Sequence, residues 1–165
     1  TKLKEFCFLF EPLLTGKYGN GTLKIAVKNF RKADGDVDFE DKIENYSSVF
    51  DGLCSQNREK ELAQKISSRL GRLIGRNTEE ASNIKEQQRD FYRVRGKVTH
   101  GRELKRPVEM HTITRCREWA RKAILLYSLV CTAKSHEEVV SCMDKNSWNP
   151  EDRKRLDYAI RTLYS

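Results

Sequence analysis

The sequence lacks the features that would place it in a membrane or around a metal ion. No apolar run approaches the ~20 residues of a membrane-spanning helix, and the first residues do not resemble a signal peptide. The five cysteines form no CxxC pair, and none of the three histidines has metal-ligand spacing beside a cysteine pair. These absences exclude a disulfide framework and an integral membrane segment, and they favour a reduced cytoplasmic protein with no metal or other cofactor.

Acidic residues are the minority among the charged side chains. The chain of 165 residues has 32 Lys and Arg against 24 Asp and Glu, which gives a formal net charge of +8 and a pI near 9.3. Such an excess suits a polyanionic partner. It is concentrated in one segment of 14 residues that contains a single acid, Glu103. Besides Arg95, the basic residues of this segment are Arg93, Lys97, Arg102, Lys105 and Arg106, which we predict to bind RNA.

Hydrophobic periodicity divides the chain into two parts. Residues 1–38 are predicted to form an N-terminal arm or the end of a preceding domain. In this part Leu23, Ile25 and Val27 alternate as in a strand, which predicts a small hairpin or an irregular, extended arm. Residues 39–165 have helical periods and predict an all-α bundle. We expect its helices over 39–53, 62–74, 79–99 and 107–132, with two short helices after Ser135 and Asn149. We also expect the helices over 79–99 and 107–132 to pack together.

Two ligand-binding motifs are excluded by missing residues. Asp34, Asp36 and Asp38 have the spacing of the first ligands of a calcium loop, but Phe39 stands at the glycine position and Asn45 at the position of the bidentate glutamate. A solvated turn is the prediction instead. The glycines at 16 and 21 have phosphate-loop spacing without the lysine that the loop requires.

The segment from Phe91 to Gly101 has the strongest indication of chemistry. At about 100° per residue, Arg95 points within about 20° of Ile84, inside the apolar stripe of its helix. A cation there must extend to solvent, pair with a carboxylate of a neighbouring helix or open into a cleft, because burying it unpaired is costly. His100 would point about 160° from Ile84. Both side chains therefore reach one site only if the helix ends or deforms between Gly96 and His100.

The order of residues in this segment resembles a family signature. The pair Phe91-Tyr92 precedes Arg95, four intervening residues and His100-Gly101, which resembles the Rx4–6H motif of the HEPN superfamily in its Apea-like form. The helix containing the sequence YSSVFDGL over 46–53 and the next, with its internal Arg69, are similar to the family's earlier helices. The resemblance covers roughly residues 39–132.

The resemblance implies a HEPN-like bundle that dimerises and brings two Arg–His pairs into one basic cleft. Many family members are metal-independent endoribonucleases, often of bacterial defence or toxin systems. By analogy, Arg95 would hold the scissile phosphate and His100 would act as general acid or base on the ribose 2′-OH or the leaving 5′-oxygen. An arginine fork and a histidine that titrates near neutral pH suit these roles. Tyr92 and Thr99 lie 3 and 4 residues from Arg95 and would border the same cleft.

The chain departs from the family at two positions. Gly96 stands where active members frequently carry a small polar residue, and Asp51 stands where relatives often carry Glu. Asp51 could pair with Arg95 or Arg69, tune the site or lie on the surface.

Two functions from different classes follow. The first is a metal-independent endoribonuclease acting as a homodimer, and the second is a non-catalytic RNA-binding or dimerisation module of a larger regulatory protein. The Arg95–His100 pair favours the first, and Gly96 favours the second. A DNA-binding regulator is a weaker third, since no helix-turn-helix spacing stands out.

Overall fold

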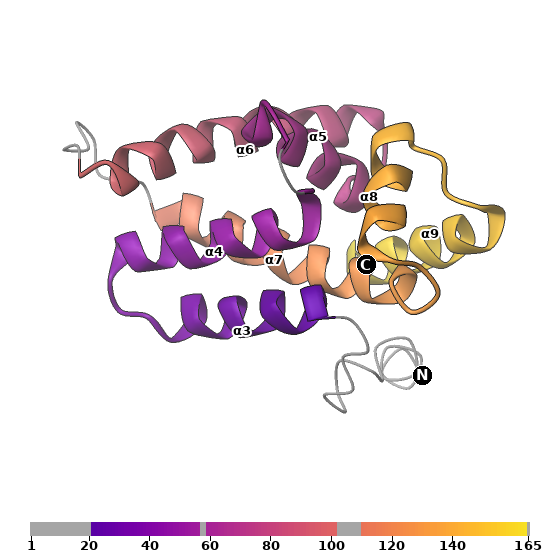
Figure 1. The fold of residues 1–165 in the computed structure, drawn as a ribbon, viewed down its shortest axis with the longest axis horizontal. Helices are drawn as coiled ribbons and strands as arrows, with labels where there is room; N and C mark the ends of the chain where they lie inside the picture. The colour runs from indigo at the N-terminus through magenta and orange to yellow at the C-terminus, as the bar shows by residue number, and fades with distance from the viewer. Residues whose placement is uncertain (1–20, 57–58, 102–109, 165) are drawn as a thin grey trace.

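The computed structural model describes residues 21–56, 59–101 and 110–164, and this part of the chain is all helical, with no strand (Figure 1). The predicted all-α class is therefore confirmed. The helices are α3 (Gly21–Gly35), α4 (Phe39–Cys54), α5 (Leu62–Ile74), α6 (Thr78–Thr99), α7 (Met110–Val130), α8 (His136–Lys145) and α9 (Pro150–Tyr164). None of them is both long and apolar enough to cross a membrane.

The predicted strand around Leu23, Ile25 and Val27 is wrong, because these residues belong to α3. Leu23, Ala26 and Ala33 are buried at helical spacing, while Ile25 is 56% exposed and Val27 is half-buried. The short alternation of apolar residues does not form a strand, because the buried apolar face of the helix packs on α4 and α7. The rest of the predicted arm, residues 1–20, lies outside the described residues.

The helices after residue 38 begin and end close to their predicted positions. Capping residues explain this agreement. The Ser135 hydroxyl accepts a hydrogen bond from the Glu138 N–H at 3.2 Å, and the Glu138 carboxylate accepts from the Ser135 N–H at 2.7 Å, which completes the predicted capping box of α8. Asn149 accepts from the Asp152 N–H at 2.8 Å at the start of α9. The segment 107–109, where the fourth helix was expected to begin, is outside the described residues.

Three aspartates lie at the end of α3 and in the turn before α4, and each of them binds a neighbouring group. Asp38 caps α4 by accepting from the N–H of Glu40 at 2.9 Å, and Asp36 accepts from the Asn45 amide at 2.7 Å. Asp34 pairs with Arg117 of α7 at 2.5 Å. Each aspartate has a local partner that accounts for its position.

The helix α6 packs against α5 and α4. Among the described residues its main neighbours are therefore not α7, the next helix in the chain, on which it was expected to pack. Its ring contact with α4 is edge-to-face between Phe91 and Phe50, with centroids 5.9 Å apart. The connection from α5 to α6 is only residues 75–77, which makes the two helices neighbours. A Cβ added to Gly71 would lie 2.4 Å from the Ala81 carbonyl oxygen, so this close approach of two backbones requires glycine.

A buried arginine ties the ends of three helical segments together. The side chain of Arg69 on α5 is 1% exposed. Its guanidinium donates to the Glu59 carboxylate at 2.6 Å and to the Asp144 carboxylate at 2.6 and 2.7 Å, and to the Cys54 carbonyl at 2.8 Å. The segment between α4 and α5 is thereby joined to α8. The charge of Arg69 is compensated in full, which is the condition for burying a cation.

Candidate functional site

The guanidinium of Arg95 on α6 faces α4 and pairs with two of its carboxylates. Its Nη1 atom is 3.3 Å from Oδ2 of Asp51, and its Nε atom is 3.5 Å from Oε2 of Glu44. The side chain is 29% exposed, and its guanidinium carbon lies 5.8 Å from the centroid of the Tyr92 ring. Pairing with carboxylates of a neighbouring helix, one of the three arrangements that the sequence allows, is the one the structure contains.

Asp51 is shared between Arg95 and Tyr92. The Tyr92 hydroxyl donates to Oδ1 of Asp51 at 2.5 Å. Burial raises the pKa of the Asp51 carboxyl above its ordinary value, although Tyr92 and Arg95 act in the opposite direction. Burial and the neighbouring Asp51 raise the pKa of Tyr92 as well. Among the options for Asp51, the structure selects the pairing with Arg95, since Arg69 is occupied by other partners.

Glu44 is the residue of this site that the sequence analysis missed. Its carboxylate accepts a hydrogen bond from the Thr99 hydroxyl and is the second partner of Arg95. The signal was available, because Glu44 and Asp51 are seven residues apart on α4 and therefore lie on one face, two turns from each other. The structure thus brings together Asp51, Tyr92, Arg95 and Thr99, as expected, and adds a second carboxylate.

His100 lies apart from this cluster. The helix α6 runs without deformation through Gly96 and ends at Thr99; the His100 N–H still donates to the Gly96 carbonyl at 3.3 Å, and Gly101 with φ 60° terminates the helix. His100 is exposed. It is about 140° around the helix axis from Arg95, and no hydrogen bond or ion pair joins the two within the described residues. One chain by itself therefore does not place both side chains on one face.

The predicted RNA-binding residues are placed only in part. Lys97 is exposed on α6, and Arg93 is exposed but pairs with Asp90 at 2.5 Å. Arg102, Lys105 and Arg106 lie outside the described residues.

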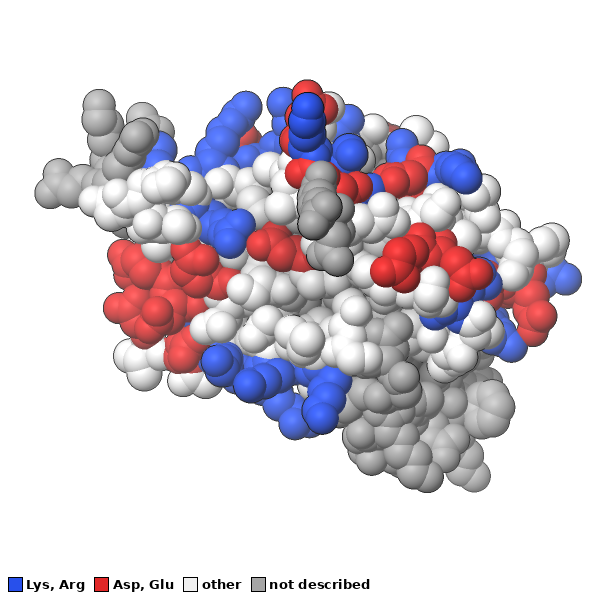
Figure 2. Space-filling view, viewed as in Figure 1, with Lys and Arg blue, Asp and Glu red and all other residues white. Residues whose placement is uncertain are grey.

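The charge around the site is not uniformly basic. Figure 2 shows an acidic patch where α3 is followed by α4 and a basic strip along α3. The acidic patch consists of Asp34, Asp36, Asp38, Glu40, Asp41 and Glu44. The basic strip, a feature that the sequence analysis missed, consists of the exposed residues Lys24, Lys28, Arg31 and Lys32. The acidic patch extends to Glu44 itself, so the α4 side of the site repels polyanions.

No group of three or more His, Cys, Asp or Glu side chains in the described part of the chain is arranged to hold a metal ion. Comparison with models of protein families, with curated proteins and with solved structures finds no match to this chain.

Proposed function

We propose that this chain is a metal-independent endoribonuclease in which Arg95 binds the scissile phosphate and His100 transfers the proton. The observation that carries the proposal is the fixed, part-exposed guanidinium of Arg95. Contacts at 3.3 and 3.5 Å orient it, and an arginine has five N–H donors, so donors remain for a phosphate. An arginine that neighbouring carboxylates hold in place is pre-organised to bind an anionic transition state.

The chemistry uses the nucleophile that RNA itself carries. The 2′-oxygen attacks the phosphorus, and the bond from phosphorus to the 5′-oxygen breaks. A base removes the proton of the 2′-OH, and an acid delivers a proton to the leaving 5′-oxygen. His100 would serve as acid or base in these transfers. Because His100 and Arg95 of one chain lie on different faces of α6, we propose that a second copy completes the site, as the resemblance to dimeric HEPN proteins implies. A role in bacterial defence or as a toxin in the cytoplasm belongs to the same proposal.

The decisive experiment measures RNA cleavage in chelator by the full chain and matched variants. His100→Ala should lower the rate about 10²–10⁴-fold. Arg95→Ala should also lower the cleavage rate severely. The products of the wild type should end in 2′,3′-cyclic phosphate or 3′-phosphate. His111→Ala, an exposed histidine of α7, and Arg89→Ala, an exposed ion-paired arginine of α6, serve as controls and should cleave at the wild-type rate. Cleavage by His100→Ala at full rate contradicts the assignment.

A second function is favoured by a different observation. The ion pairs of Arg95 with Asp51 and Glu44 make it a structural link between α6 and α4, which suits a non-catalytic RNA-binding or dimerisation module. In that case Arg95→Ala should lower the melting temperature while His100→Ala is silent, and the wild type should bind RNA and leave it intact. Sedimentation equilibrium at about 50 µM tests the dimer that both functions invoke.

A further inference from the structure

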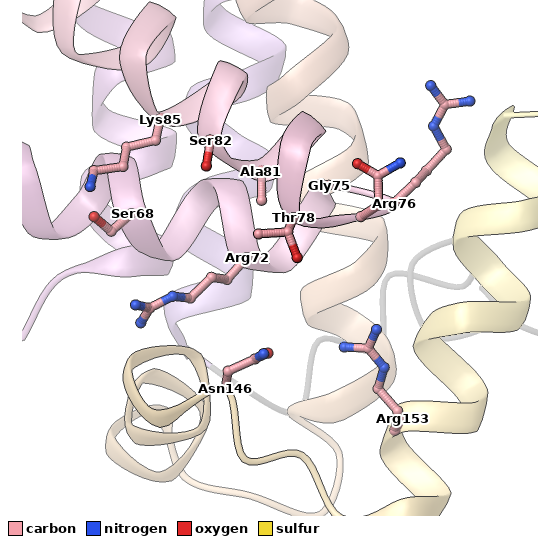
Figure 3. A pocket seen from close by; sticks show the side chains of 11 residues that line it. Ser68, Arg72, Gly75, Arg76, Thr78, Ala81, Ser82, Lys85, Asn146 and Arg153 are labelled. Atoms are coloured by element: carbon pink, nitrogen blue, oxygen red, sulfur yellow. The ribbon is translucent and has the colours of Figure 1, made fainter.

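A basic cavity lies at the opposite end of α6 from Arg95. It has a volume of about 320 Å³ and is enclosed by α5, the start of α6, the end of α8 and α9 (Figure 3). No acidic residue lines it. Its basic residues are Arg72, Arg76, Lys85 and Arg153. At 1.5 Å per residue, Lys85 is about 15 Å from Arg95 along the helix axis, so the cavity is a separate site.

The cationic side chains of the cavity differ in how strongly they are engaged. Arg72 is held as part of the wall, because its Nη1 donates to the Met143 carbonyl at 2.9 Å and to the Asp144 carbonyl at 2.5 Å. Lys85 is half-buried and forms no ion pair with a described residue. Arg153 pairs with Asp157 at 3.1 Å, but both side chains are solvent-exposed, and such a pair contributes little and exchanges readily.

Arg76 contributes less to the interior than its place in the lining suggests. It pairs with Glu80 at 2.9 Å, and in Figure 3 its guanidinium extends away from the other three cations. Among the described residues, the acidic partners of the lining cations are Glu80 and Asp157, and the carboxylate of Asp144 is bound by Arg69. Arg72, Lys85 and Arg153 leave a net positive interior.

Neutral donors complete the lining. Hydroxyl groups come from Ser68, Thr78 and Ser82. The cavity also takes in the N-terminal turn of α6, where Asn77 caps the Glu80 N–H at 2.9 Å and the N–H groups of the two preceding residues have no acceptor within the helix. The positive end of the helix dipole adds to the lysine and arginine charges.

The composition of the cavity indicates the kind of anion it accepts. No aromatic side chain lines it, and Ala81 is its one apolar side chain, so a nucleobase has no surface on which to stack. A volume of about 320 Å³ is at the small end for ligand sites. We propose that this cavity binds the phosphate or diphosphate group of a small, non-aromatic ligand.

Isothermal titration of the full chain with sodium pyrophosphate tests the proposal. Binding should be saturable at one site per chain, and the double variant Lys85→Gln/Arg153→Gln should weaken it at least tenfold. The matched control Lys24→Gln/Lys28→Gln removes the same charge from the exposed face of α3 and should change the affinity less than twofold. Melting curves establish that both variants are folded. Amide NMR shifts should locate the bound pyrophosphate at Thr78, Glu79 and Ser82.

Three results would overturn the assignment. The first is no saturable binding of pyrophosphate at about 10 mM, and the second is an equal loss of affinity in the α3 control, which would indicate diffuse charge attraction. The third is tight binding of a single-stranded oligonucleotide that depends on Lys85 and Arg153 while pyrophosphate does not compete. That result would make the cavity a contact for a nucleic-acid backbone. Loss of RNA cleavage on His100→Ala has no bearing on this site, so the two proposals fail independently.

Discussion

The Tyr92 hydroxyl donates a 2.5 Å hydrogen bond to Oδ1 of Asp51, across the interface between α6 and α4. The other carboxylate oxygen of Asp51 faces Arg95. Tyr92 and Arg95 are one turn apart on α6 and both contact Asp51. The hydrogen bond from Tyr92 therefore helps to position the carboxylate that binds Arg95. Loss of this hydrogen bond should change both the free energy of unfolding and the activity that we propose for Arg95.

We expect Tyr92→Phe to destabilise the protein by about 1–3 kcal/mol, because it leaves a part-buried carboxylate oxygen without its donor. Urea unfolding measures the change. In a double-mutant cycle, Asp51→Asn should cost less in the Tyr92→Phe background than in the wild type. Strictly additive effects of the two substitutions would show that the hydrogen bond carries no coupling energy.

Arg69→Met should cost about 3–5 kcal/mol, because it leaves two carboxylates beside a buried site without their cation. Arg89→Met on the exposed surface of α6 is the control and should change the free energy of unfolding by less than about 0.5 kcal/mol. If the two variants have the same stability, the ion pairs of Arg69 with Glu59 and Asp144 do not stabilise the fold.

The ion pair between Arg69 and Glu59 should make the free energy of unfolding depend on pH in the acidic range. Hydrogen bonding to Arg69 lowers the pKa of Glu59 from an ordinary value of 4.5 to about 2. The stabilisation from the ionised carboxylate is fully present above pH 4.5 and is lost as the pH falls toward about 2. The difference in unfolding free energy between wild type and Glu59→Gln should therefore shrink between about pH 5 and pH 2.5. A difference that stays constant across this range would contradict the lowered pKa.

Glycine substitutions should separate close packing from backbone entropy. Gly71→Ala places a Cβ 2.4 Å from a backbone oxygen of Ala81 that cannot move without shifting α6, so we expect a marked loss of stability. A Cβ on Gly52, within α4, or on Gly96, within α6, meets no atom within 4 Å. Alanine at either position should raise stability by about 0.5–1 kcal/mol. Thermal and urea unfolding of the three variants make the comparison.

Gln88 should be replaceable with a gain. Its side chain is 0% exposed, and neither its amide nitrogen nor its amide oxygen has a hydrogen-bond partner in the described part of the chain. Gln88→Met keeps the shape and removes the unsatisfied groups, so stability should rise by about 1–3 kcal/mol in urea unfolding. A loss instead would show that the amide has a partner, such as a buried water.

The sequence predicts the positions of most helices but not how they pack against one another. Stripes such as Ile43, Tyr46 and Phe50 have the period of a helix, and Ser135 and Asn149 start helices through hydrogen bonds to neighbours in the chain. Both effects are local. The pairing of α6 with α5 depends on the missing side chain at Gly71, which no period reveals. The strand expected in α3 failed because Leu23, Ile25 and Val27 are too few to distinguish two periods.

The candidate site was predictable where its residues share one helix face. Tyr92, Arg95 and Thr99 are three and four residues apart, so their proximity follows from the helix alone. Asp51 and Glu44 are seven residues apart on α4, but nothing in the chain says that this face meets α6. The relation of His100 to Arg95 depends on whether α6 bends at Gly96, and a helix with glycine can do either.

The Arg69 network also bears on the order in which the chain can fold during synthesis. Arg69 and Glu59 leave the ribosome together, whereas Asp144 follows 75 residues later. Until Asp144 arrives, the Arg69 guanidinium would have to give up its hydration with only one of its two carboxylate partners present, and that cost delays its burial. Nascent α5 should thus stay exposed to chaperones and proteases until α8 emerges. Ribosome-bound chains arrested with Asp144 still inside the exit tunnel and with Asp144 outside it should differ sharply in their resistance to proteolysis.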